Sequence, residues 1–83
     1  EVETRYHIDM EVQDRTGVLA AISAVFADND VSLRTVRQED GADTARLIVV
    51  THAAKEVTLD TIVAALGELE EVNSVHSVIR LGS

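Results

Sequence analysis

The spacing of the apolar residues changes from period two to helical period and back, and does so twice along this chain. This repeated change restricts the possible folds more than any other feature. Apolar and polar residues alternate from Arg5 to Gln13, which predicts a strand with one buried face. After Gly17 the apolar residues recur at the spacing of one helix face, at Val18, Ile22, Val25 and Phe26. Asn29 is a good candidate for a left-handed residue at the end of this helix.

A second strand is predicted over residues 31–39. Its apolar residues Leu33 and Val36 are out of phase, so we expect a bulge or an edge position there. After a turn at residues 40–43, a third strand over residues 44–52 contains a run, 47–50, that is apolar on both faces.

The second half then returns to helical spacing, with apolar residues at Leu59, Ile62, Val63, Leu66 and Leu69. A loop is expected at residues 53–57, and Thr58 is expected to be the N-cap of a second helix. An acidic turn with Glu68, Glu70 and Glu71 precedes a last strand over residues 72–81. The apolar residues expected in phase on that strand are Val75, Ile79 and Leu81.

Two strand–helix–strand units in this order predict an α+β fold of the ferredoxin-like βαββαβ type. In that fold a four-stranded antiparallel sheet carries both helices on one face. We expect one domain over residues 1–83, with its core from about residue 5 to residue 81. The other sheet face and the edge of the second strand have no covering element, so they are predicted association surfaces, and we expect at least a homodimer.

Charge and composition exclude several classes of protein. A formal net charge of -8 argues against binding to nucleic acid or to an anionic membrane. The chain has no cysteine, and its three histidines show no ligand spacing, so we expect no metal site. The absence of cysteine is consistent with a cytoplasmic protein. Because the chain begins with Glu1 rather than methionine, we expect it to be a piece of a longer protein.

The turn Asp14–Leu19 is the strongest candidate for a binding site. The first amides of the predicted helix lack intrahelical partners and carry partial positive charge, which suits a carboxylate. Asp14 beside them could accept hydrogen bonds from an ammonium group, and Gly17 allows a ligand to approach the backbone closely. Together these features suit an α-amino acid. The alternative is that Asp14 or Thr16 simply caps the helix.

No residue set indicates catalysis. Ser74, His76 and Ser77 are neighbours in sequence, but strict alternation would send Ser77 to the opposite sheet face. His7 and Asp9 are expected to form a solvated or interfacial pair. Runs of charged residues are usually exposed to solvent, and we expect the same of the acidic turn.

The chain resembles the ACT domain family, whose members are amino-acid-sensing regulatory modules of metabolic enzymes. The matching pattern is Asp14-Arg15-x-Gly17-Val18-Leu19, then Phe26, then Val31-Ser32-Leu33. The family commonly has proline at the position of Thr16. Further segments are similar to the C-terminal regulatory segment of bacterial homoserine dehydrogenases: Arg5–Ile8, Asp14–Ala20, Val31–Glu39 and Leu47–His52.

This resemblance implies a feedback-inhibition domain for L-threonine, attached to a catalytic domain that uses NAD(P). It implies no cofactor and no catalytic residue within these 83 positions. The effector would lie between subunits, held by the turn of one subunit and the second strand of its neighbour. On this sequence the turn residues are Asp14, Arg15, Thr16, Gly17, Val18 and Leu19, and the strand residues are Ser32, Leu33 and Arg34.

Three other interpretations remain open. An ACT domain of another amino-acid-pathway enzyme would have the same pattern, and a dimerisation module without ligand binding would have the same fold. An acylphosphatase-like hydrolase would need an arginine in a glycine-bearing loop and an asparagine, for which only Arg15 and Asn29 are available. An RNA-binding domain of this topology is disfavoured, because Tyr6 is the only aromatic residue on the predicted strands and the chain is strongly acidic.

Overall fold

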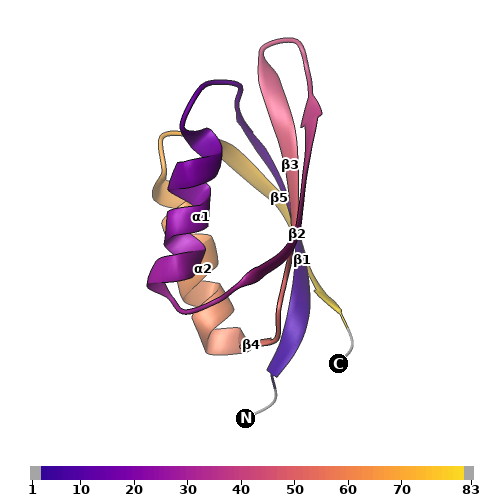
Figure 1. Cartoon of the computed structure of the whole chain (residues 1–83), viewed down its shortest axis with the longest axis vertical. Helices are drawn as coiled ribbons and strands as arrows, with labels where there is room; N and C mark the ends of the chain where they lie inside the picture. Colours follow the sequence, from indigo (N-terminus) through magenta and orange to yellow (C-terminus); the bar gives the residue numbers. More distant parts are fainter. Residues whose placement is uncertain (1–2, 82–83) are drawn as a thin grey trace.

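A computed structural model describes residues 3–81 of the chain; the predicted domain limits at residues 1 and 83, and Glu1 itself, lie outside this range. The elements in chain order are β1 (Glu3–Gln13), α1 (Val18–Asp28), β2 (Leu33–Asp40), β3 (Thr44–Thr51), β4 (Ala54–Lys55), α2 (Glu56–Glu68) and β5 (Val72–Leu81). All the strand pairs are antiparallel, in the order β2-β3-β1-β5, with the two-residue β4 beside the start of β1. Both helices lie on one side of the sheet (Figure 1), which confirms the predicted ferredoxin-like α+β fold.

The core lies between the sheet and the helices. Alternation along β1 sends Tyr6, Ile8, Met10 and Val12 into it, as predicted. The facing residues of β3 and the apolar stripes of the two helices complete it: Ala45, Leu47, Val49, Val18, Ile22, Phe26, Leu59, Ile62 and Leu66. The hydrophobic stripes read from the sequence therefore do face the sheet.

The end of α1 differs from the prediction by one residue. Asn29 has φ -106°, and the left-handed residue is Asp30, with φ 58°. The Asn29 side chain instead donates from Nδ2 to the carbonyl of Val25 at 2.8 Å. This bond satisfies a carbonyl that the helix end would leave free, and Asp tolerates the left-handed conformation nearly as well as Asn.

The start of α2 also differs. The predicted loop at residues 53–57 contains β4 and the first turn of the helix, and the N-cap is Lys55 rather than Thr58. β1 begins two residues earlier than predicted, so Glu3 and Thr4 offer the chain a pairing partner at Lys55 and Ala54. The backbone is thereby kept extended up to Lys55, and Glu56 occupies the favourable acidic position in the first helical turn.

The bulge or edge position expected in β2 is confirmed. The register between β2 and β3 shifts between Leu33 and Thr35, and β2 pairs only with β3 among the described strands.

A second bulge, in β5, changes which residues face the helices. The register with β1 passes from Ser77 opposite Asp9 to Val75 opposite Met10, which leaves His76 as an extra residue. Val75 therefore packs against the core, whereas Ile79 lies opposite His7 on the other face and is 51% exposed. The prediction that Val75, Ile79 and Leu81 are in phase is wrong. The bulge also places Ser77 on the same face as Ser74, contrary to strict alternation.

In the part of the chain that the structure describes, neither helix has the length and the apolar character needed to cross a membrane.

Candidate functional site

The turn between β1 and α1 leaves the N-terminus of the helix without a side-chain cap. Gly17 is the N-cap, with φ +91°, and no side-chain hydrogen bond caps the helix. The alternative in which Asp14 or Thr16 caps α1 is therefore not what the structure has. The amide of Val18 makes only a long contact, 3.5 Å, with the carbonyl of Arg15. Unpartnered amides and the helix dipole together favour an anionic group at this position.

A small hollow of about 100 Å³ lies beside these amides, and we call it the Gly17 hollow. The residues that line it are Val12, Gln13, Arg15, Gly17, Val18, Leu19, Gln38 and Leu47. Val12 and Leu47 are buried, whereas Arg15 is exposed and Leu19 is 44% exposed. Ligand pockets for drug-sized molecules measure roughly 300–1,000 Å³, so this hollow suits a very small ligand or one part of a ligand.

Four of the six predicted turn residues line the Gly17 hollow: Arg15, Gly17, Val18 and Leu19. Asp14 and Thr16 are exposed in the same turn but do not line it.

Sequence reasoning missed two glutamine residues, Gln13 and Gln38, among those that line the hollow. Gln38 reaches the hollow because it pairs with Leu47, whose side chain is in the core between sheet and helices. The sequence contained one indication of this: Gln38 is a polar residue at a β2 position whose side chain faces the helices.

The predicted strand residues lie elsewhere in the same chain: Leu33 and Arg34 begin β2, which starts two residues later than predicted, and Ser32 precedes it. Ser32 and Leu33 line a separate hollow with Phe26 and Asp30, near the end of α1 that is opposite Gly17. The backbone carbonyl of Ser32 accepts a hydrogen bond from the amide of His52 at 2.9 Å. Their predicted role concerns a neighbouring subunit, and it stays a prediction.

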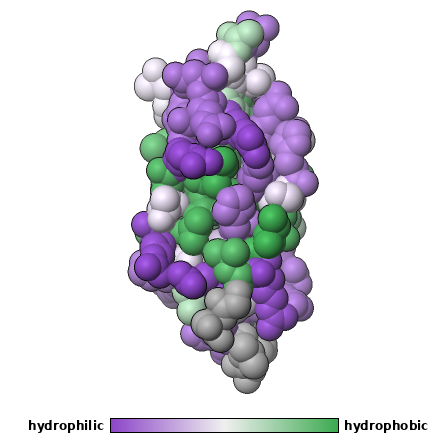
Figure 2. Space-filling view, turned by 90° about the vertical axis from the view of Figure 1, so that its right-hand side faces the viewer, coloured by the Kyte–Doolittle hydropathy of each residue, from purple (hydrophilic) through white to green (hydrophobic). Residues whose placement is uncertain are grey.

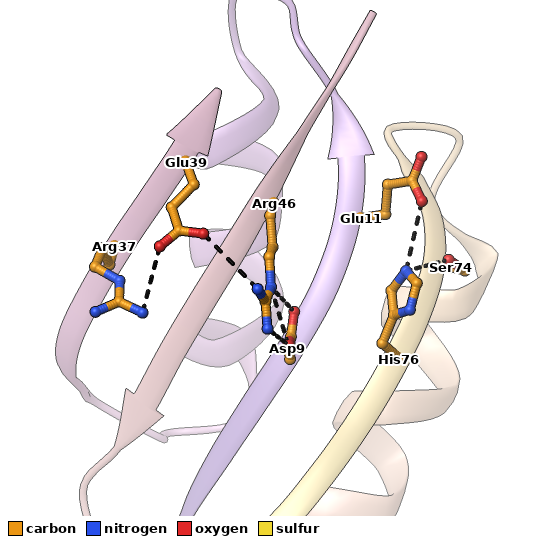
Figure 3. A network of polar contacts seen from close by, with 7 residues as sticks. All are labelled: Asp9, Glu11, Arg37, Glu39, Arg46, Ser74 and His76. Carbon is orange, nitrogen blue, oxygen red and sulfur yellow. Dashed lines mark hydrogen bonds and ion pairs between the residues drawn. The ribbon is translucent and has the colours of Figure 1, made fainter. Parts of the chain in front are cut away.

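The sheet face that points away from the helices, here called the open face, is apolar in the middle and hydrophilic above (Figure 2). A chain of ion pairs crosses its hydrophilic part (Figure 3). Arg46 Nε donates to the two carboxylate oxygens of Asp9 at 2.9 and 3.1 Å, and Arg46 also lies 3.8 Å from Glu39. The hydrogen bond from Arg46 lowers the pKa of the Asp9 carboxyl, which is largely buried, below its ordinary value. Asp9 therefore pairs with Arg46 and not with His7.

His76 also lies on the open face, but its geometry does not fit nucleophilic catalysis. Its Nε2 atom is 3.2 Å from the hydroxyl of Ser74 and 3.4 Å from a carboxylate oxygen of Glu11. A catalytic triad needs the serine and the carboxylate on different ring nitrogens, so that the carboxylate orients the base. Among the described residues, no group of three or more His, Cys, Asp and Glu side chains is arranged to hold a metal ion.

A model of one protein family, described as "ACT domain", matches residues 6–71. Among curated proteins, the homoserine dehydrogenase of Corynebacterium glutamicum is 52% identical over 81 residues, and that of Mycobacterium tuberculosis is 46% identical over 86 residues. These matches cover 98% and 96% of this chain but only 18% and 20% of the relatives. The chain thus spans about a fifth of the length of the curated relatives it matches.

Solved structures that are similar to this chain include a homoserine dehydrogenase and an ACT domain. A homoserine dehydrogenase from Thiobacillus denitrificans superposes with a TM-score of 0.87 at 28% identity, covering 98% of this chain and 18% of that one. The ACT domain from the GTP pyrophosphokinase of Chlorobium tepidum superposes with a TM-score of 0.71 at 19% identity, covering 95% and 99% of the two chains. At that identity the second likeness shows the fold alone.

Proposed function

Because this chain belongs to the ACT domain family, we propose that it binds a small amino acid, L-threonine being favoured, and regulates a homoserine dehydrogenase. The observation that carries this proposal is the uncapped N-terminus of α1 beside the Gly17 hollow. Its amides suit the carboxylate that all α-amino acids share.

The surroundings of the Gly17 hollow support a small, partly polar ligand. The effector's carboxylate would face the amides of Val18 and Leu19, and its ammonium group would face Asp14. The buried Val12 and Leu47 offer an apolar floor, and the carboxamides of Gln13 and Gln38 can hydrogen-bond a hydroxyl group. A short side chain with both a methyl and a hydroxyl group would use both kinds of surface.

The proposed effector site is completed by a second copy of the chain. β2 pairs only with β3 among the described strands, and its residues 34–40 are exposed, so its free edge can add to the edge of another sheet. Ser32, Leu33 and Arg34 of the neighbouring subunit would then contribute to the site. An effector that binds one subunit arrangement more tightly shifts the population towards it, by a coupling of about 1–3 kcal/mol in typical cases.

In this proposal the hydride-transfer chemistry belongs to a separate catalytic domain that binds NAD(P). The chain would contribute regulation only, through its contacts with that domain. The share of the relatives that it covers, about a fifth, is compatible with such a division of labour.

The test is thermal denaturation of the chain with a panel of amino acids. At ten times its dissociation constant, a specific ligand stabilises the folded state by about 1.4 kcal/mol. We expect L-threonine to raise the melting temperature and Asp14→Ala to abolish the increase. Asp60→Ala, which removes an exposed carboxylate in α2, is the matched control and should keep the increase. No response to any amino acid at millimolar concentration would contradict the proposal.

A dimerisation module without a ligand is the second candidate, and the exposed edge of β2 favours it. It predicts a stable dimer together with no response to the panel. The acylphosphatase-like alternative has less support. Arg15 precedes α1 and Asn29 follows it, so the 11-residue helix, about 16 Å long, separates them.

A further inference from the structure

Gln13 contacts two parts of the molecule that are far apart in sequence. It is the last residue of β1 and lines the Gly17 hollow. Its backbone amide donates to the carbonyl of Glu71 at 2.9 Å, and its side-chain Nε2 donates to the carbonyl of Glu70 at 3.1 Å. One residue therefore connects the hollow with the turn between α2 and β5.

The hydrogen bond between the Gln13 carboxamide and Glu70 can respond to a ligand. The group has two N–H donors and one carbonyl acceptor, and the bond to Glu70 uses a single donor. A ligand in the Gly17 hollow would lie against Gln13. Coupling between the hollow and the turn requires that this contact changes the orientation of the Gln13 side chain. A change in that orientation would lengthen or strengthen the bond to Glu70.

The α2–β5 turn is suited to respond as a unit. It is tightened by hydrogen bonds from the amide of Leu69 to Leu66 and from the amide of Val72 to Leu69. Glu68 and Glu70 are exposed, and Glu71 is half-buried. A displacement of the Glu70 carbonyl therefore moves carboxylates on the molecular surface, where a neighbouring domain can sense them.

We infer that Gln13 is a positioning residue that couples occupation of the Gly17 hollow to the acidic turn formed by Glu68, Glu70 and Glu71. This inference rests on the proposed function, since it assigns the route by which the bound effector is sensed. Gln38 provides a matched comparison, because it lines the same hollow but donates to Asp40 at 3.3 Å instead of to the turn.

The first experiment follows backbone amide signals by NMR while the chain is titrated with L-threonine. In the wild type we expect the amides of residues 17–19 and of residues 68–72 to shift together. In Gln13→Ala at saturating threonine, residues 17–19 should still shift and residues 68–72 should not. In Gln38→Ala the dissociation constant should rise, but both groups should shift at saturation. A full response of residues 68–72 in Gln13→Ala would overturn the inference.

The second experiment needs no ligand and separates this inference from the proposed function. Glu70→Gly changes the backbone of the turn, and we expect it to alter the amide shifts of residues 17–19 in the wild-type background. In the Gln13→Ala background the same substitution should leave them unaltered, while thermal denaturation confirms that all variants fold. Equal effects in the two backgrounds would overturn the coupling. A wild-type chain that ignores every amino acid would instead overturn the proposed function.

Discussion

Gly17 determines the geometry of the candidate site through its backbone alone. Its φ of +91° lies in the region that L-amino acids rarely adopt, although an added Cβ would meet no atom within 4 Å. The constraint is therefore conformational and not steric. Gly67, in the last turn of α2, also has open space around it but has no left-handed backbone.

These two glycines predict opposite effects of the same substitution. Gly17→Ala should lower the free energy of unfolding by about 1–2 kcal/mol, since it forces a side chain into the left-handed region. Gly67→Ala should raise it by up to about 0.5–1 kcal/mol, because alanine is the better helix former. Urea denaturation of the two variants measures both values. A stabilising Gly17→Ala would contradict the conformational explanation.

At the same scale, the pair between Arg46 and Asp9 predicts a dependence of stability on pH. The lowered pKa of Asp9 stabilises the folded state above the ordinary carboxyl pKa of about 3.9, and this contribution is lost as the pH falls through the lowered value. Arg46→Met should therefore reduce stability at neutral pH, and the loss should be smaller near pH 2. Urea midpoints at both pH values test this.

The control for that experiment is Arg37→Met. Arg37 pairs with Glu39 at 3.5 Å, and both side chains are about half exposed or more. Such surface pairs contribute little, so the loss at neutral pH should be smaller than for Arg46→Met. Equal losses would mean that the partial burial of Asp9 is unimportant.

Among the elements, those with strong periodicity were predictable from the sequence. β1, α1 and the stripe of α2 each follow one period over several turns or pleats, and β3 contains a continuous apolar run. The structure places these elements as predicted. The early start of α2 was not predictable, because it depends on Ala54 and Lys55 finding partners on β1. The same holds for Gln38, which reaches the Gly17 hollow only through the register of β2 on β3.

The bulge at His76, one of two register shifts between β5 and β1, is the clearest case of a feature hidden from periodicity. A single extra residue, His76, reverses the faces of everything that follows it, and its position depends on pairing with β1. The local sequence contains no glycine at that position to mark it.

Strict alternation would place Val75 and Ile79 on the same sheet face, but the bulge places them on opposite faces. Their contributions to stability should therefore differ. Val75→Ala should destabilise the chain by about 1–2 kcal/mol, because Val75 packs against the core. Ile79→Ala removes a larger part of a side chain but should change stability by less than about 0.5 kcal/mol, because Ile79 is 51% exposed. Chemical denaturation of a dilute sample measures both. A larger loss for Ile79→Ala would place the bulge elsewhere.

For the whole molecule, mutations can test the proposed association of copies and locate its interface. Val36 is 40% exposed on the edge strand β2, and Val57 is 60% exposed at the start of α2. If copies associate along β2, Val36→Lys should shift the chain towards monomer in sedimentation experiments, because it places a charge in the interface. Val57→Lys should leave the association unchanged. The opposite result would move the interface to the α2 side.

The left-handed turn at Gly17 also has a consequence for the speed and strength of the proposed effector binding. Ordering the backbone of one residue costs roughly 1–2 kcal/mol, and here β1 and α1 have already ordered residues 14–17 during folding. A ligand that docks on such a preorganised turn loses little affinity to conformational entropy. The helix end can therefore act as a fixed receptor, open to diffusional encounter, without a loop that must close first.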